Sequence, residues 1–210
     1  MKSAGTKDYH ENDVAIPNTS GKGIKLGSYS EATPLFGWRD ITSEINVRGV
    51  GATDPTWSQI GSGPFFAYDF AVNDVCWMSF HIPHDIVPNS TINLHAHWLS
   101  DGTETNSVKW EFIYAYAKGF DQAAFDMAAG TTVTAEEAAS GTAFQHMVTE
   151  TTSQTISGLD EPDGIVYTRI RRITNGATDN TDSIFLLTSD IHYQSTNIAT
   201  RQKSPNFYAD

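Results

Sequence analysis

The chain has 210 residues and a formal net charge of −12, from 13 Lys and Arg against 25 Asp and Glu. This length suits one domain with a real hydrophobic core, with or without long arms. The densest basic run is the short "RIRR" at 169–172, so the surface that neutralises phosphates in nucleic-acid-binding proteins is missing and no nucleic-acid partner is expected.

Apolar runs are short throughout the sequence. None approaches the ~18 residues that a membrane helix needs, and the first residues lack the apolar segment of a signal peptide, so no membrane partner is expected. Cys76 is the one cysteine, which precludes an internal disulfide and suits folding in a reducing cytoplasm. We expect it to be a small buried hydrophobe.

Residues 1–35 show neither a helical nor a strand period and are rich in Gly, Ser, Thr and Asn. We expect an extended arm, because ordering such a segment costs conformational entropy that only a partner surface offsets. Its apolar side chains are spaced like anchors for that surface. The anchors expected to make contact are Tyr9, Ile16, Ile24 and Tyr29.

From residue 36 to residue 195, short runs of alternating apolar residues recur with turn signals between them, which is typical of β-strands. The clearest run is "SVKWEFIYAYA", in which Lys109 and Glu111 point away from the apolar face. That face is expected to lie in the core, and it comprises Val108, Trp110, Phe112, Tyr114 and Tyr116. The expected strands are 45–48, 65–72, 75–82, 91–99, 107–117, 144–150, 164–173 and 183–193.

Only "FDQAAFDMAAG" and "TAEEAASG" have a helical composition, and both are short. About eight strands with long connections and no βαβ alternation predict an all-β fold, an antiparallel β-sandwich that is jelly-roll-like. We therefore expect an N-terminal arm at 1–35, a single β domain at 36–195 and a C-terminal tail at 196–210.

The stretch "STINLHAHWLSDGTE" holds two histidines one residue apart. Because strand side chains alternate, His95 and His97 are expected on the face opposite Leu94 and Trp98. Cupins use such a pair to hold a metal, with a Glu a few residues later and a further His on a distant strand. Here Glu104 follows at a longer interval, and the glycines that bracket the cupin motif are missing.

Further ligands for a metal exist in the sequence. Asp190 and His192 share a face in "SDIHYQ", and Glu111 is another carboxylate. Metal candidates are accordingly His95, His97 and His192. The simpler interpretation, which we prefer, assigns these histidines to hydrogen bonds on a surface or to a subunit contact, with no metal and no cofactor.

Other catalytic patterns are lacking. The sequence has no Gly-x-Ser-x-Gly elbow, phosphate loop, His-Glu-x-x-His pair or dinucleotide fingerprint, so no catalytic residue is expected. His81 and His84 in "HIPHD" are expected at a strand end and a turn. Trp38, Trp57 and Trp77 suit either a sugar-binding groove or, more commonly, core and subunit contacts.

Three segments carry a resemblance to a known family: "FHIPHDIVPNSTINLHAHW", "EPDGIVYTRIRR" and "DIHYQSTNIATRQKSPNFY". They resemble a family of virion structural proteins of tailed bacteriophages that accompany capsid and neck components. The similarity runs from about Phe36 to Tyr208. It implies a structural role and not a catalytic one.

The expected function is that of an outer capsid decoration or cement protein, which binds and stabilises the head shell as a homo-oligomer, expected to be a trimer. The expected partner is the major capsid protein or another virion protein, and the expected location is the outer capsid surface after synthesis in the host cytoplasm. His95 and His97 are then candidates for a subunit contact.

Two alternatives stay open: a neck or tail spike domain that recognises a host-surface glycan, and a cupin-like metalloenzyme. In the C-terminal tail, Phe207 and Tyr208 are expected to bury apolar area on a partner, the alternative being that the tail packs back on its own domain.

Overall fold

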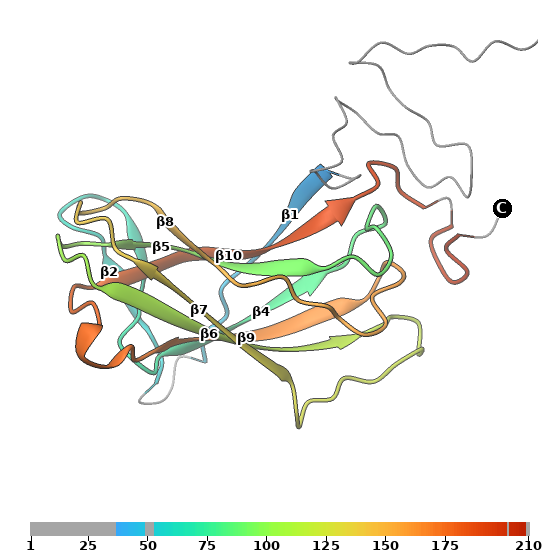
Figure 1. The fold of residues 1–210 in the computed structure, drawn as a ribbon, viewed down its shortest axis with the longest axis horizontal. Helices are drawn as coiled ribbons and strands as arrows, with labels where there is room; N and C mark the ends of the chain where they lie inside the picture. The colour runs from blue at the N-terminus through green and yellow to red at the C-terminus, as the bar shows by residue number, and fades with distance from the viewer. Residues whose placement is uncertain (1–36, 49–52, 201, 209–210) are drawn as a thin grey trace, which may run out of the picture.

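The computed structural model describes residues 37–48, 53–200 and 202–208. Within them the chain forms ten strands in two sheets. Figure 1 shows these sheets as two layers, with the long strands β5 and β10 in one and β6 and β9 in the other. The predicted arm, with Tyr9, Ile16, Ile24 and Tyr29, lies outside the described residues.

The first sheet has six strands in the order β2-β3-β10-β5-β8, and β1 also pairs with β10. β10 is the longest strand, and its first half pairs with β3 while its second half pairs with β1 on the same side. The strands are β1 (Gly37–Ser43), β2 (Thr56–Gln59), β3 (Phe66–Asp69), β5 (Ile92–Ser100), β8 (Met147–Glu150) and β10 (Ile184–Ser195).

The second sheet has four strands in the order β4-β9-β6-β7. They are β4 (Val75–His81), β6 (Ser107–Ala117), β7 (Thr131–Ala138) and β9 (Ile165–Ile173). Among the described residues, Gly176–Thr178 forms the one helical turn, a 3-10 turn before β10. None of the residues that the structure describes forms a helix long and apolar enough to cross a membrane.

The antiparallel pairing between strands is nested. β3 pairs with β10, β4 with β9, β5 with β8 and β6 with β7. An eight-stranded ribbon folded over on itself gives this pattern, in which strands far apart in sequence become neighbours. The fold is therefore the all-β antiparallel sandwich that the sequence predicts.

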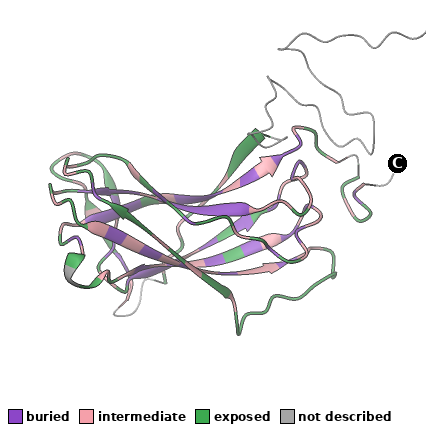
Figure 2. Cartoon of the chain, viewed as in Figure 1, coloured by how far each residue is buried: buried purple, intermediate pink, exposed green. Residues whose placement is uncertain are grey.

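The core lies between the two sheets and is made by the alternate side chains of each strand. Figure 2 shows this alternation as buried segments along the central strands. On β6 the predicted apolar face does enter the core, with Val108, Trp110, Phe112 and Tyr114 buried and Tyr116 packed against them. The ring of Trp110 meets that of Phe70 edge to face at 5.5 Å.

The run "RIRR" is divided between the two faces of its sheet. Arg169 and Arg171 donate to opposite oxygens of Glu111 at 2.8 and 3.0 Å. Arg172 is buried instead and donates to the backbone carbonyls of Phe70 and Asn180. The run therefore presents no basic patch.

The structure corrects the two helical interpretations and adds strands. The "TAEEAASG" stretch begins within β7, paired with β6 from Thr131 to Ala138, and 120–130 forms turns and irregular backbone. Helices this short are marginal in water, so pairing with a long neighbouring strand prevails over helix propensity. The strand expected at 45–48 is reduced to a single bridge from Asn46 to Trp77, while β1 and β2 are additional.

The C-terminal tail packs back on its own domain after β10 ends at Ser195. The backbone amide of Thr200 donates to the carbonyl of His84 at 3.1 Å. Phe207 is buried, with its ring 5.5 Å from His84 and 5.8 Å from Phe120. Burial, with Glu161 and Asp160 nearby, raises the pKa of Tyr208 to about 12. Phe207 is thus not a free anchor for a partner.

Replacing Trp110 with Ala is expected to destabilise the domain by ~3–5 kcal/mol, because it leaves a large cavity between the sheets. Urea unfolding followed by circular dichroism measures this loss, with the exposed Trp57→Ala as the matched control. A cost for Trp110→Ala no larger than that of the control would contradict the assigned core.

Candidate functional site

Seven polar side chains gather on the outward face of the six-stranded sheet, opposite the core. On β5, Leu94, Ala96 and Trp98 face the core, so His95 and His97 face outward as predicted. Asp190 and His192 of β10 lie beside them, since Asp190 pairs with His95 in the strand register. The remaining members are Asp40 of β1, Glu150 of β8 and His146, which directly precedes β8.

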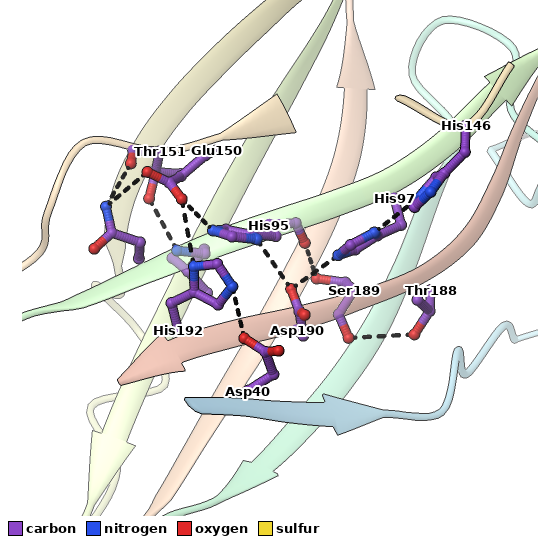
Figure 3. A network of polar contacts seen from close by, with 12 residues as sticks. Asp40, His95, His97, His146, Glu150, Thr151, Thr188, Ser189, Asp190 and His192 are labelled. Atoms are coloured by element: carbon purple, nitrogen blue, oxygen red, sulfur yellow. Dashed lines mark hydrogen bonds and ion pairs between the residues drawn. The ribbon is translucent and has the colours of Figure 1, made fainter. Parts of the chain in front are cut away.

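These side chains form one continuous chain of contacts across four strands, which Figure 3 shows. At one end, Asp40 Oδ1 lies 2.6 Å from His192 Nε2, and His192 Nδ1 lies 3.5 Å from Glu150 Oε2. The same Glu150 oxygen lies 2.5 Å from His95 Nε2. Carboxylates and imidazoles therefore alternate along this half of the chain.

The second half continues from His95. Asp190 Oδ1 lies 3.3 Å from both His95 Nδ1 and His97 Nε2. The other ring nitrogen of His97 is 2.9 Å from Nε2 of His146, and these two rings stack with centroids 5.1 Å apart. We call the whole set the histidine network: Asp40, His95, His97, His146, Glu150, Asp190 and His192.

Burial differs strongly along the histidine network. The side chains of His95 and Asp190 are 3% and 6% exposed, whereas that of Glu150 is 50% exposed. Neighbouring side chains of the network cover His95, although it lies on the outward face of the sheet. The network is thus a buried centre with a solvent-facing rim.

Burial and neighbouring charges shift the pKa values of the central residues of the network in different directions. Burial lowers the pKa of His95, and nearby His192 lowers it further against the opposing effect of Asp190 and Glu150. The hydrogen bond to Asp190 raises the pKa of His97 despite its burial. Burial alone would raise the pKa of Asp190, but the hydrogen bond from His97 and the adjacent imidazoles lower it. Asp190 is therefore a carboxylate flanked by donors.

Nε2 of His95 is buried, and its close neighbour is Glu150 Oε2 at 2.5 Å. This contact is an ion pair that is poorly aligned as a hydrogen bond. Buried polar atoms usually have well-aligned hydrogen bonds, so the arrangement is unusual.

Two of the carboxylates suggested by the sequence are elsewhere. Glu104 accepts from the amide and the hydroxyl of Thr181 at 2.6 and 2.7 Å. Glu111 lies on the other sheet and binds Arg169 and Arg171. The structure instead brings His192 and Asp190 to the histidine pair. It also places the pair outside the sandwich and not between the sheets, where a site enclosed by a β-barrel would be.

Sequence reasoning missed Asp40, His146 and Glu150. Asp40 lies on a strand that was not expected at all, and Glu150 is the last residue of the four-residue β8. The sequence did predict a strand at 144–150, which contains His146 and Glu150. Alternation alone does not specify that this strand pairs with β5.

Among the described residues, His81, His84 and the three tryptophans considered above lie outside the histidine network. His81 is the last residue of β4, and His84 follows it in the next turn; each lies 3.1 Å from Asp163. The ring of Trp38 is 6.5 Å from that of His192, whereas Trp57 contacts Phe66 and Tyr68. Trp77 lies on the second sheet beneath Arg48. The three tryptophans therefore form no common sugar-binding groove.

Replacing Asp190 with Ala is expected to destabilise the domain by about 1–3 kcal/mol, because it removes the acceptor beside the buried His95 and the partly buried His97. Thermal or urea unfolding measures the change. The control is Glu137→Ala, which removes an exposed carboxylate from β7. Equal stability of Asp190→Ala and the parent would show that the centre is not a structural element.

Comparison with known proteins identifies no relative of this chain. The sequence matches no protein-family model, and no curated protein is significantly similar to it. A functional proposal therefore rests on the fold and the surfaces of the domain.

Proposed function

We propose that this protein is a structural component of a tailed-bacteriophage virion, an outer capsid decoration or cement protein that binds and stabilises the head shell. The observation that carries the proposal is the nested pairing of β3 with β10, β4 with β9, β5 with β8 and β6 with β7. It supports a jelly-roll assignment, since eight strands in two sheets with Greek-key connections define that fold. Viral capsid domains commonly have it.

The interior of the sandwich favours a structural role over catalysis. Its largest buried side chains are aromatic and fill the space between the sheets, among them Trp98, Trp110, Phe70, Phe80 and Phe112. A β-sandwich whose interior is filled in this way offers its binding surfaces on the outside, at faces and edges. Contact with a large partner suits that arrangement better than enclosure of a small substrate.

An aromatic patch on the β2–β3 hairpin supports a contact with another protein. Trp57, Phe65 and Phe66 are 59%, 70% and 49% exposed. Trp57 stacks on Phe66 and meets Tyr68 edge to face, and Tyr68 in turn packs against the core. Exposed aromatic clusters on a rigid edge are typical of protein interfaces. We assign this patch to the capsid surface.

The net charge of −12 also favours the outside of the head. A protein on the inner surface would face packaged DNA, whose phosphates repel an acidic protein. An acidic exterior protein meets no such opposition.

The location in the particle tests the proposal directly. We expect density for the sandwich on the outer head shell in a map of the intact virion, with a copy number comparable to that of the major capsid protein. Replacing Trp57 and Phe66 with Ser is expected to reduce incorporation strongly while leaving the fold intact, and Met127→Ser, equally exposed at another site, is the control. A few copies confined to the neck or tail would favour the spike alternative.

Free protein is expected to sediment as a homo-oligomer, with a trimer as the proposed state, because the domain leaves more aromatic surface exposed than a small monomer usually does. Analytical ultracentrifugation at micromolar concentration measures this. Strictly monomeric sedimentation would contradict the proposed trimer.

A further inference from the structure

Two imidazole nitrogens of the histidine network face a single carboxylate oxygen. His95 Nε2 and His192 Nδ1 lie 2.5 and 3.5 Å from Glu150 Oε2. The two rings meet edge to face with centroids only 3.7 Å apart. The contact of Glu150 with the buried Nε2 of His95 is close but poorly aligned as a hydrogen bond.

The donor set matches that of a transition-metal site. Two imidazoles with one carboxylate form a common protein site for Zn²⁺ and related ions. Donor atoms around tetrahedral Zn²⁺ lie about 3.3 Å apart, given bonds of about 2.0–2.1 Å. The three donors here all lie within 4.8 Å of one another. The Glu150 side chain is half exposed, so a small rotation adjusts its one short contact.

The outer nitrogen of each imidazole faces a second carboxylate. Asp190 Oδ1 lies 3.3 Å from His95 Nδ1, and Asp40 Oδ1 lies 2.6 Å from His192 Nε2. Histidines that bind metals nearly always direct their other ring nitrogen to such a group, which fixes the ring and strengthens the ligand. Both candidate ligands have this support.

Other groupings in the network are less suitable. His97 and Asp190 also come close to His95, but the ring nitrogens of His97 already bond Asp190 and His146. The grouping of Asp40, Asp190 and His192 offers only one imidazole. In the group with Glu150, two imidazoles face one carboxylate oxygen, and the buried Nε2 of His95 makes no well-aligned hydrogen bond. This distinction selects one set of ligands.

The geometry points to a binding site for one divalent transition-metal ion such as Zn²⁺, held by His95 Nε2, His192 Nδ1 and a carboxylate oxygen of Glu150. The ion joins β5, β10 and β8, and Asp40 extends the support to β1. The Glu150 side chain is half exposed, so the site is accessible to an ion from solvent. The site is independent of the proposed capsid role.

Metal binding by the full-length protein tests the site. After removal of metals with a chelator, a calorimetric Zn²⁺ titration is expected to show one ion per chain, and Zn²⁺ is expected to raise the melting temperature. Mg²⁺ and Ca²⁺, which prefer oxygen ligands, are expected to do neither. Glu150→Gln and His192→Asn alter partly exposed side chains, so both variants are expected to fold and to lose more than about 100-fold in Zn²⁺ affinity.

Asp40→Asn is expected to weaken Zn²⁺ binding by about 10–100-fold, the usual effect of losing an outer carboxylate. His81→Ala is the matched control, because His81 also pairs with a carboxylate, Asp163, but lies outside the network. Absence of stoichiometric binding would overturn the inference. Binding that survives unchanged in Glu150→Gln and His192→Asn would likewise overturn it, since it would place the ion elsewhere.

Discussion

A one-residue bulge in β10 is the constraint on which the two faces of the larger sheet depend. Leu186 pairs with Trp98, but Thr188 pairs with His97, so Leu187 is an extra residue without a partner on β5. Before the bulge, Ile184 and Leu186 face the core; after it, Ile191 and Tyr193 do. If β10 instead alternated regularly through Leu187, Asp190 and His192 would face the core. The bulge therefore aligns both with His95 and His97 outside the sandwich.

This arrangement separates the two kinds of interaction that hold the domain. Apolar burial lies between the sheets, where Trp98 and Trp110 are completely buried. The titratable groups lie on the outward face, where solvent reaches the rim of the histidine network. Charged groups enclosed in an apolar interior carry a large desolvation cost, so their placement on the outer face leaves the core free for packing. Arg172 is an exception, and backbone carbonyls of Phe70 and Asn180 satisfy it.

Sequence periodicity predicted the buried and outward faces of strands that have one polar face, but it did not identify every strand. The alternation in β5 and β6 correctly assigned their core residues and the outward direction of His95 and His97. It failed at β7, because the Ala and Glu residues of "TAEEAASG" favour a helix until β6 supplies a pairing partner. Glu150 and Asp40 join the network through long-range strand pairing with β5 and β10. No local pattern encodes such pairing, so two of the network's three carboxylates, Asp40 and Glu150, could not be identified from the sequence.

The charge balance of the histidine network gives a reason for a cation at its centre. Asp40, Glu150 and Asp190 place three carboxylates along one connected chain, and the lowered pKa of Asp190 keeps that buried group ionised. The hydrogen bond to Asp190 raises the pKa of His97, so that imidazole offsets part of this negative charge. Repulsion among partly buried carboxylates is costly where the local dielectric is low. A divalent ion bound by Glu150, His95 and His192 would offset the negative charge and would coordinate the buried Nε2 of His95.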